Sequence, residues 1–290
     1  MAGLLAGALW GLVFVAPRMA AGYSPVDFTA GRFVAYGLTA LVMTGLAARP
    51  RLPDARQALA AIGMSLLGFT GYYLLLVFAI RDAGTEVPSL VIGTIPLWVM
   101  LLGKPGHLRW SALVPGLVLT AAGLGLMLSA SSPGGVADGA QFWRGVALAV
   151  ASLACWTAFA LLNSAFLKRH PEVNVTSWAN WLGLATGAGA LGLWALAGSP
   201  LAALQSQPAA PMFALLCLAT GVGSAWFATI LWNVASRRLS ASLCGQLIVS
   251  ETLFALAYSF AWDGRWPSAA EAAAVLLFTL GILASIQAHR

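Results

Sequence analysis

The feature that most constrains this chain is a succession of apolar runs, each long enough to cross a bilayer. A membrane-spanning helix needs about 20 largely apolar residues, and we count ten such runs in the 290 residues. They lie at residues 2–20, 26–47, 57–80, 86–103, 110–130, 142–167, 175–197, 210–234, 239–262 and 267–288. Only 8% of the residues are charged, whereas a soluble domain carries about 25%. We therefore expect an all-α integral membrane protein with ten transmembrane helices.

Short polar turns separate the runs, and they limit what the chain can do. Residues that end helices occur at 49–54, 104–107, 131–135 and 169–172. None of these turns is long enough for a nucleotide-binding domain, and the motif GxxxxGK[ST] is absent. The sequence also lacks GxSxG, paired catalytic acids and a His/carboxylate metal set. It thus predicts neither ATP-driven transport by this chain alone nor an enzyme, and no cofactor, metal or nucleic-acid partner.

The basic residues predict how the runs are oriented. With both termini in the cytoplasm, ten Lys and Arg fall in cytoplasmic segments, four fall outside and Arg32 lies within the second run. The ten are Arg49, Arg51, Arg56, Lys104, Arg109, Lys168, Arg169, Arg237, Arg238 and Arg290, and the four are Arg18, Arg81, Arg144 and Arg265. Cytoplasmic loops are enriched in Lys and Arg. We therefore expect a multi-pass protein of the inner (plasma) membrane with both termini in the cytoplasm.

The two halves of the sequence resemble each other. The stretch that starts at Trp10 corresponds to the one at Trp156, residues 78–81 correspond to 233–237, and Pro96 falls where Thr252 lies. Each half holds five runs, an odd number, so the second half enters the membrane upside down relative to the first. We expect a five-helix repeat over 1–137 and an inverted five-helix repeat over 138–290. Such inverted repeats are typical of secondary transporters, with the substrate site near the midplane.

Four stretches carry a resemblance to a known family. They are the start at Trp10–Gly11, the pair Arg32–Phe33, the run Pro96–Leu97–Trp98, and the run from Glu251 to Arg265. The chain resembles the drug/metabolite transporter superfamily, in its ten-span EamA-type branch. Within the last stretch it departs from the family pattern EPvfA…gE, since Thr252 replaces the usual proline and Asp263 the usual glutamate.

Within that family, the sequence is most similar to the YddG-type exporters of aromatic amino acids. This resemblance implies a secondary transporter that exports aromatic or other bulky neutral amino acids and related small metabolites by alternating access. Its expected partners are the lipid bilayer and a small-molecule substrate.

Of the charged residues, Arg32 and Glu251 lie furthest inside the runs. A charge inside hydrocarbon costs about 2.5–3.5 kcal/mol on insertion scales, so each is a candidate for function. Glu251 is either a proton-coupling or substrate-ammonium group, or a hydrogen-bonded carboxyl that joins its helix to a neighbour. Arg32 either extends to the outer interface, pairs with Asp27, or binds a substrate carboxylate.

Neutral polar and aromatic residues in several runs form the candidate substrate site. Amide side chains are costly against lipid, so we expect them to face protein or a water-filled cavity. Aromatic rings beside them would form walls suited to flat or apolar side chains, although the tryptophans could equally serve packing alone. The candidate substrate-binding residues are Trp10, Phe14, Tyr72, Tyr73, Thr94, Trp98, Ser152, Trp156, Asn163, Trp226, Thr229, Asn233, Gln246 and Ser250.

Two alternatives and one packing expectation complete the predictions. The first alternative is an exporter of cationic drugs or other metabolites that uses Glu251 as the cation partner. The second is a membrane-embedded enzyme or a sensor that does not transport.

We expect close helix packing at two sets of glycines, the ladder Gly3–Gly7–Gly11 and the pair Gly183–Gly187.

Overall fold

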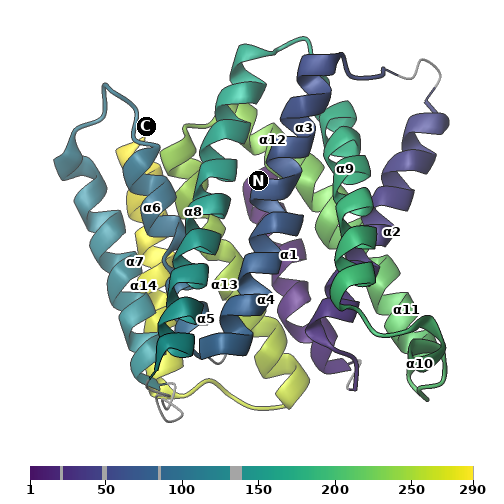
Figure 1. Cartoon of the computed structure of the whole chain (residues 1–290). Helices are drawn as coiled ribbons and strands as arrows, with labels where there is room; N and C mark the ends of the chain where they lie inside the picture. The colour runs from purple at the N-terminus through teal and green to yellow at the C-terminus, as the bar shows by residue number, and fades with distance from the viewer. Residues whose placement is uncertain (20–21, 48–50, 84–85, 131–138, 290) are drawn as a thin grey trace.

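The structure, a computed structural model, describes residues 1–19, 22–47, 51–83, 86–130 and 139–289. Over these residues all regular structure is helical and no strand occurs, which confirms the all-α expectation (Figure 1). The helices are α1 (Ala2–Met19), α2 (Pro25–Gly45), α3 (Ala55–Gly68), α4 (Thr70–Ala83), α5 (Glu86–Gly93), α6 (Ile95–Leu102), α7 (Trp110–Ala130), α8 (Ala140–Arg169), α9 (Val175–Ala197), α10 (Leu201–Gln205), α11 (Ala210–Ala219), α12 (Ala228–Arg238), α13 (Ala241–Asp263) and α14 (Ala269–Ala288). A π-helical segment, η1 (Thr220–Phe227), joins α11 to α12.

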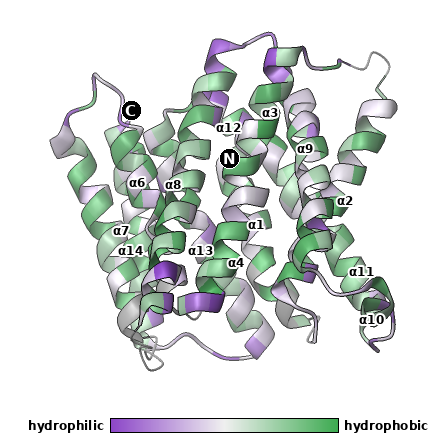
Figure 2. Cartoon of the chain, in the orientation of Figure 1, coloured by the Kyte–Doolittle hydropathy of each residue, from purple (hydrophilic) through white to green (hydrophobic). Residues whose placement is uncertain are grey.

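Six of the described helical stretches are long and apolar enough to cross a membrane. They are Pro25–Gly45, Ala55–Ala83, Ala140–Arg169, Ala210–Arg238, Ala241–Asp263 and Ala269–Ala288. Shorter apolar stretches lie at Ala2–Val13, Val91–Leu102 and Trp110–Leu126. Figure 2 shows apolar residues along the sides of the bundle, while the hydrophilic residues concentrate towards its two ends. These features define an all-helical membrane protein.

Polar caps begin several helices at the turns between the apolar runs. The Ser24 side chain accepts a hydrogen bond from the Asp27 N–H at the start of α2, and Pro25 occupies the first turn. Asp54 and Ser268 form capping boxes at the starts of α3 and α14. Such caps satisfy N–H groups that the first turn of a helix leaves without a partner. They place these helix starts within a few residues of the expected boundaries.

The expected run 57–80 is not one continuous helix. It divides into α3 and α4 at Phe69, whose φ of −130° and ψ of −90° lie outside helical values. A Cβ on Gly68 would lie 2.4 Å from the Phe159 ring, and one on Gly71 would lie 2.4 Å from the Leu66 carbonyl oxygen. Only glycine tolerates such close approaches, so the glycines on either side of Phe69 permit the break.

Two further runs depart from a regular α-helix. The run 86–103 divides into α5 and α6 at Thr94, because Pro96 has no N–H to continue the helical ladder. The Thr94 hydroxyl donates a 2.6 Å hydrogen bond to the Val91 carbonyl. The run 210–234 contains η1, in which each turn holds more residues than in an α-helix. The faces of the chain beyond η1 are therefore rotated relative to the 3.6-residue period.

Glycines set the closest contacts between helices. Gly3, Gly7 and Gly11 of α1 face α13, and a Cβ on Gly7 would lie 2.2 Å from the Ser250 hydroxyl oxygen. Gly183 and Gly187 of α9 likewise face α2. Both expected glycine surfaces are confirmed. Small residues let helix backbones approach closely, which strengthens dispersion contacts inside a membrane, where the hydrophobic effect contributes little to helix association.

Two glycines of α9 provide a matched test of this packing. A Cβ on Gly187 would lie 2.8 Å from the Cα of Gly37, whereas a Cβ on Gly192 would meet no atom within 4 Å. We expect Gly187→Ala to destabilise the protein by about 1–3 kcal/mol through overpacking. Gly192→Ala should be neutral, or stabilising by about 0.5–1 kcal/mol through helix propensity. Thermal unfolding of the purified protein in detergent measures both, and equal midpoints for the two variants would contradict the packing.

Candidate functional site

Trp10 lies halfway along α1 and contacts aromatic rings on two other helices. Its ring centroid is 6.5 Å from that of Trp156 on α8 and 5.2 Å from that of Trp232 on α12. Trp232 is buried, whereas Trp10 and Trp156 are only partly buried against the same apolar core. Because these rings come from three packed helices, the cluster lies inside the bundle at the middle of its length. Two of the candidate residues, Trp10 and Trp156, are thus in direct contact.

Arg32 of α2 and Glu251 of α13 place opposite charges near one another. Their charges interact with each other and with the Tyr72 side chain of α4. The Arg32 guanidinium carbon lies 4.7 Å from the centroid of the Phe33 ring, and its buried Nε has no hydrogen-bond partner among the described residues. Charges interact more strongly in an apolar bundle than in water. A solute that reaches this region would meet one basic and one acidic side chain.

Asp27 does not pair with Arg32, which corrects one interpretation of the sequence. Its buried carboxylate accepts hydrogen bonds from the N–H and the hydroxyl of Ser199, each 2.7 Å long, and from the Ser24 hydroxyl at 2.7 Å. It also lies in the first turn of α2, where the helix dipole favours an anion. Asp27 therefore joins α2 to the turn after α9.

Asn163 of α8 and Asn233 of α12 form a buried amide pair. The Asn163 Nδ2 donates a 3.1 Å hydrogen bond to the Asn233 Oδ1, and the Trp178 Nε1 of α9 donates a 2.7 Å bond to the Asn163 Oδ1. Each of these three side chains is almost completely buried. The next residue of α8, Ser164, donates through its hydroxyl to the carbonyl of Ser236, about one turn beyond Asn233 on α12, at 3.1 Å. The two amides therefore face protein and not lipid, as the sequence predicted.

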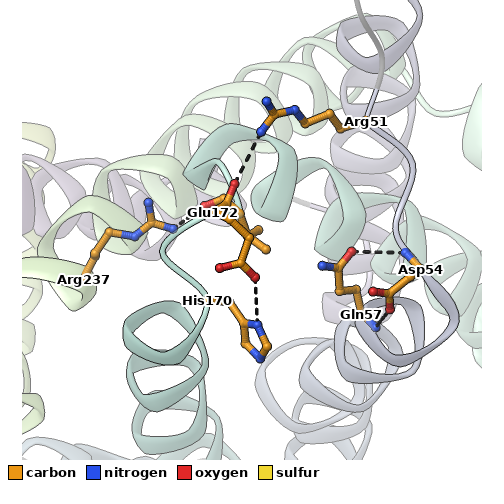
Figure 3. Close-up of polar contacts among 7 residues, drawn as sticks. Arg51, Asp54, Gln57, His170, Glu172 and Arg237 are labelled. Carbon is orange, nitrogen blue, oxygen red and sulfur yellow. Dashed lines mark hydrogen bonds and ion pairs between the residues drawn. The ribbon is translucent and has the colours of Figure 1, made fainter.

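The turn between α8 and α9 is held from two sides, as Figure 3 shows. The Arg237 guanidinium at the end of α12 donates to the Val173 carbonyl, and the Arg51 Nη1 donates to the Glu172 carbonyl at 3.4 Å. The Glu172 carboxylate lies 3.0 Å from the His170 ring. Its own backbone N–H and His170 bind this carboxylate and hold its pKa below the ordinary value. We call this region, with the adjoining ends of α6, α12 and α13, the α8–α9 end.

Some of the other candidate residues lie close to these groups. The Ser152 hydroxyl of α8 donates to the Tyr72 carbonyl at 2.9 Å, and the Tyr73 hydroxyl donates to the Pro25 carbonyl at 2.9 Å. Thr229 is buried one turn before Asn233 on α12. The structure therefore brings Ser152 and the tyrosine pair to the contact between α4 and α8.

Trp226 and Asn233 bind partners on two different helices. The Trp226 Nε1 donates a 2.7 Å hydrogen bond to the Asn180 Oδ1 on α9, whereas Asn233 contacts Asn163 on α8. Trp226 lies within the π-helical segment η1, which ends at Phe227, and Asn233 lies on α12. These two candidates therefore reach the neighbouring helices α9 and α8 and do not share a partner.

Three of the remaining candidates form hydrogen bonds outside the Trp10 cluster, and a fourth is partly exposed. The Gln246 Nε2 donates to the Thr120 hydroxyl at 3.0 Å and joins α13 to α7. Ser250 and Thr94 bond to carbonyls of their own helical segments, and Trp98 is 46% exposed. The side chain of Phe14 lies outside the part of the chain that the structure describes. No group of three or more His, Cys, Asp or Glu that could hold a metal ion occurs among the described residues.

Sequence reasoning missed Trp178 and Trp232, although both contact candidate residues. Trp178 is fully buried and binds the amide pair, and Trp232 packs on Trp10. An indole N–H in a membrane needs an acceptor, and Trp232 directly precedes Asn233 in the sequence. These two features of the sequence mark both tryptophans as candidates. The helix that supplies the partner of each could not be predicted from spacing along a single run.

The apolar helices and the polar groups held between them define an all-helical, multi-pass membrane protein. The model of the EamA-like transporter family matches residues 1–129. Inner membrane protein YtfF of Escherichia coli (strain K12) is 31% identical over 300 residues, covering 98% of this chain and 94% of that protein. A crystal structure with 22% sequence identity superposes with a TM-score of 0.79 over 98% of this chain and 96% of that one.

The chain belongs to the EamA-like transporter family, within the drug/metabolite transporter superfamily. It is a multi-pass inner-membrane protein of a family of transporters, and the similar crystal structure shows that its fold is one already known.

The amide pair gives a direct test of the described contacts. Asn163→Leu and Asn233→Leu should each lower the free energy of unfolding by about 1–3 kcal/mol, because each leaves the other buried amide without a partner. The double variant should cost less than the sum of the two, with a coupling of about 0.5–3 kcal/mol. Thermal unfolding of the three variants in detergent measures this coupling. Strictly additive losses would show that the two amides do not interact.

Proposed function

We propose that this protein is a secondary transporter that exports amino acids with aromatic or other bulky neutral side chains across the inner membrane by alternating access. The observation that carries the proposal is the pair of opposite charges, Arg32 and Glu251, held near each other on different helices inside the bundle. Family membership supports transport, and the charge pair supports the class of solute.

A neutral amino acid at physiological pH carries one ammonium and one carboxylate group. Arg32 offers up to five N–H donors to a carboxylate, and the Glu251 carboxylate accepts hydrogen bonds from an ammonium group. A solute with both groups therefore satisfies both fixed charges, whereas a polyanion such as a sugar phosphate leaves Glu251 repelled. The Trp10 and Trp156 rings, in contact at 6.5 Å, suit a flat or apolar side chain.

We infer that ten spans form two inverted five-helix repeats, residues 1–137 and 138–290, with the boundary in a segment outside the described residues. Two observations support this. Trp10 and Trp156, which correspond in the two halves of the sequence, touch each other, as residues near a two-fold axis do. The third and eighth runs, counterparts in this scheme, both lose α-helical geometry near their middles, at Phe69 and η1.

The proposed orientation places both termini in the cytoplasm, and with them the α8–α9 end. Arg51, Lys168, Arg169, Arg237 and Arg238 all lie at this end, and cytoplasmic segments are enriched in such residues. Under this orientation the tightly bonded α8–α9 end faces the cytoplasm.

Flux of labelled amino acids in proteoliposomes tests the proposal. The purified protein should transport labelled tryptophan, and unlabelled tryptophan should compete better than tryptamine, which lacks the carboxylate, or indole-3-propionate, which lacks the ammonium group. Protein-free liposomes are the control. Absence of amino-acid flux for a folded protein would overturn the proposal.

Two variants separate the roles of the charges. Arg32→Gln should weaken competition by tryptophan and indole-3-propionate about tenfold but leave tryptamine unaffected, since a charged hydrogen bond contributes about 1.5–3 kcal/mol. Glu251→Gln should weaken tryptophan and tryptamine and leave indole-3-propionate unaffected. If tryptamine competes best and Arg32→Gln changes nothing, the protein is instead an exporter of cations that uses Glu251.

Glu251 is also the candidate for coupling transport to protons. Gln keeps the size of the side chain but cannot titrate, so Glu251→Gln should abolish accumulation driven by a pH jump while downhill exchange continues. The measurement compares the two modes of flux for the wild type and the variant. Equal loss in both modes assigns Glu251 to binding or folding, and no loss in either mode removes it from the mechanism.

A further inference from the structure

The packing of α13 differs between its two halves. Ser242 and every residue from Cys244 to Ser250 are buried, but no later residue of α13 is. Glu251 therefore lies where the tight packing of this helix gives way to looser packing. A solute that reaches Glu251 from the end opposite the α8–α9 end meets closed structure ahead.

The helices around this boundary form two groups. Helix α1 packs most extensively on α13 and then on α12, whereas α8 packs most extensively on α4 and then on α5 and α3. The directed bonds between the two groups gather at the α8–α9 end. Among the described residues they are the Asn163–Asn233 amide bond and the Ser164–Ser236 bond, which both join α8 to α12.

One arginine crosses the same seam, and a second braces the turn that it binds. Arg237, in the last turn of α12, binds the Val173 carbonyl in the turn that follows α8, so it bridges the two groups directly. Arg51, which precedes α3, binds the Glu172 carbonyl in the same turn (Figure 3). The Arg51 carbonyl in turn accepts a 3.0 Å bond from the Trp181 Nε1. Both contacts are to backbone carbonyls, and neither is a tight carboxylate–guanidinium ion pair.

The geometry points to a gate: the bonds from Asn163 to Asn233 and from Arg237 to the Val173 carbonyl close the α8–α9 end and break in each transport cycle. This inference rests on the proposed alternating access. Each single hydrogen bond is weak in net terms, so a small set of them can hold a closed state and still release it. Trp178 is a positioning residue here, because its indole fixes the Asn163 amide with its Nδ2 directed at Asn233.

A native cysteine reports on this gate. Cys244 is 2% exposed and packs with Trp232, Ala235 and Val99 in the core shared by α6, α8, α12 and α13. Cys217 is similarly buried, at 6%, but packs with Ala16 and Phe28 away from the seam. Separation of the two helix groups at the α8–α9 end exposes Cys244 and leaves Cys217 covered.

The experiment measures thiol modification by N-ethylmaleimide in proteoliposomes for two single-cysteine proteins. One retains Cys244, with Cys155→Ala and Cys217→Ala, and the other retains Cys217, with Cys155→Ala and Cys244→Ala. Trp178→Phe, which removes only the N–H, and Arg237→Gln should each accelerate modification of Cys244 about tenfold. The rate at Cys217 should not change. Arg238→Gln is the matched control, because Arg238 is the neighbour of Arg237 in the sequence and its side chain is exposed.

The outcomes separate a gate from a purely structural contact. Parallel acceleration at Cys244 and Cys217 would show general loosening of the fold and would overturn the proposal, as would unchanged Cys244 rates in both folded variants. The readout needs no substrate, so it stands even if no amino-acid flux is found, which would overturn only the proposed function. In the Cys244 single-cysteine protein without a gate substitution, a transported amino acid should also accelerate modification of Cys244.

Discussion

Close approach of helix backbones at glycine is the interaction on which the rest of the structure depends. The four most extensive helix pairs are α2 with α9, α7 with α14, α1 with α13 and α4 with α8. Each contains a glycine whose Cβ would collide with the partner: Gly37 and Gly187, Gly116, Gly7 and Gly145. In lipid, exclusion of water does not drive helices together, so contact area and short-range attraction must do so. The positions of these glycines therefore determine which helices are neighbours.

This scaffold explains how polar groups can be placed at the centre of an apolar bundle. An unpaired amide or charge exposed to lipid would be costly. Here Asn163 and Asn233 bind each other, and Arg32 and Glu251 lie within each other's electrostatic reach. Each member of a pair comes from a different helix, so these interactions exist only once glycine packing has fixed the helix neighbours.

The sequence predicted the elements well and their contacts unevenly. Apolar run length gave the helical class and the helix boundaries, because hydrocarbon thickness and turn residues control both. The glycine packing surfaces were also predicted correctly. The bond from Trp226 to Asn180 of α9 and the bond from Gln246 to Thr120 of α7 could not be foreseen, because the sequence does not show which helix lies opposite each side chain. Periodicity predicts which side chains share a face of one helix, but it does not identify the helix that packs on that face.

The break at Phe69 has a mechanical consequence. The half of this run before the break, α3, packs on both α9 and α8, whereas the half after it, α4, packs chiefly on α8. A continuous helix would transmit any tilt of α4 along its whole length. Because the helix is interrupted at Phe69, with a glycine on each side, α4 can change its angle without carrying α3 off α9. Phe69 is thus a joint within a single apolar run.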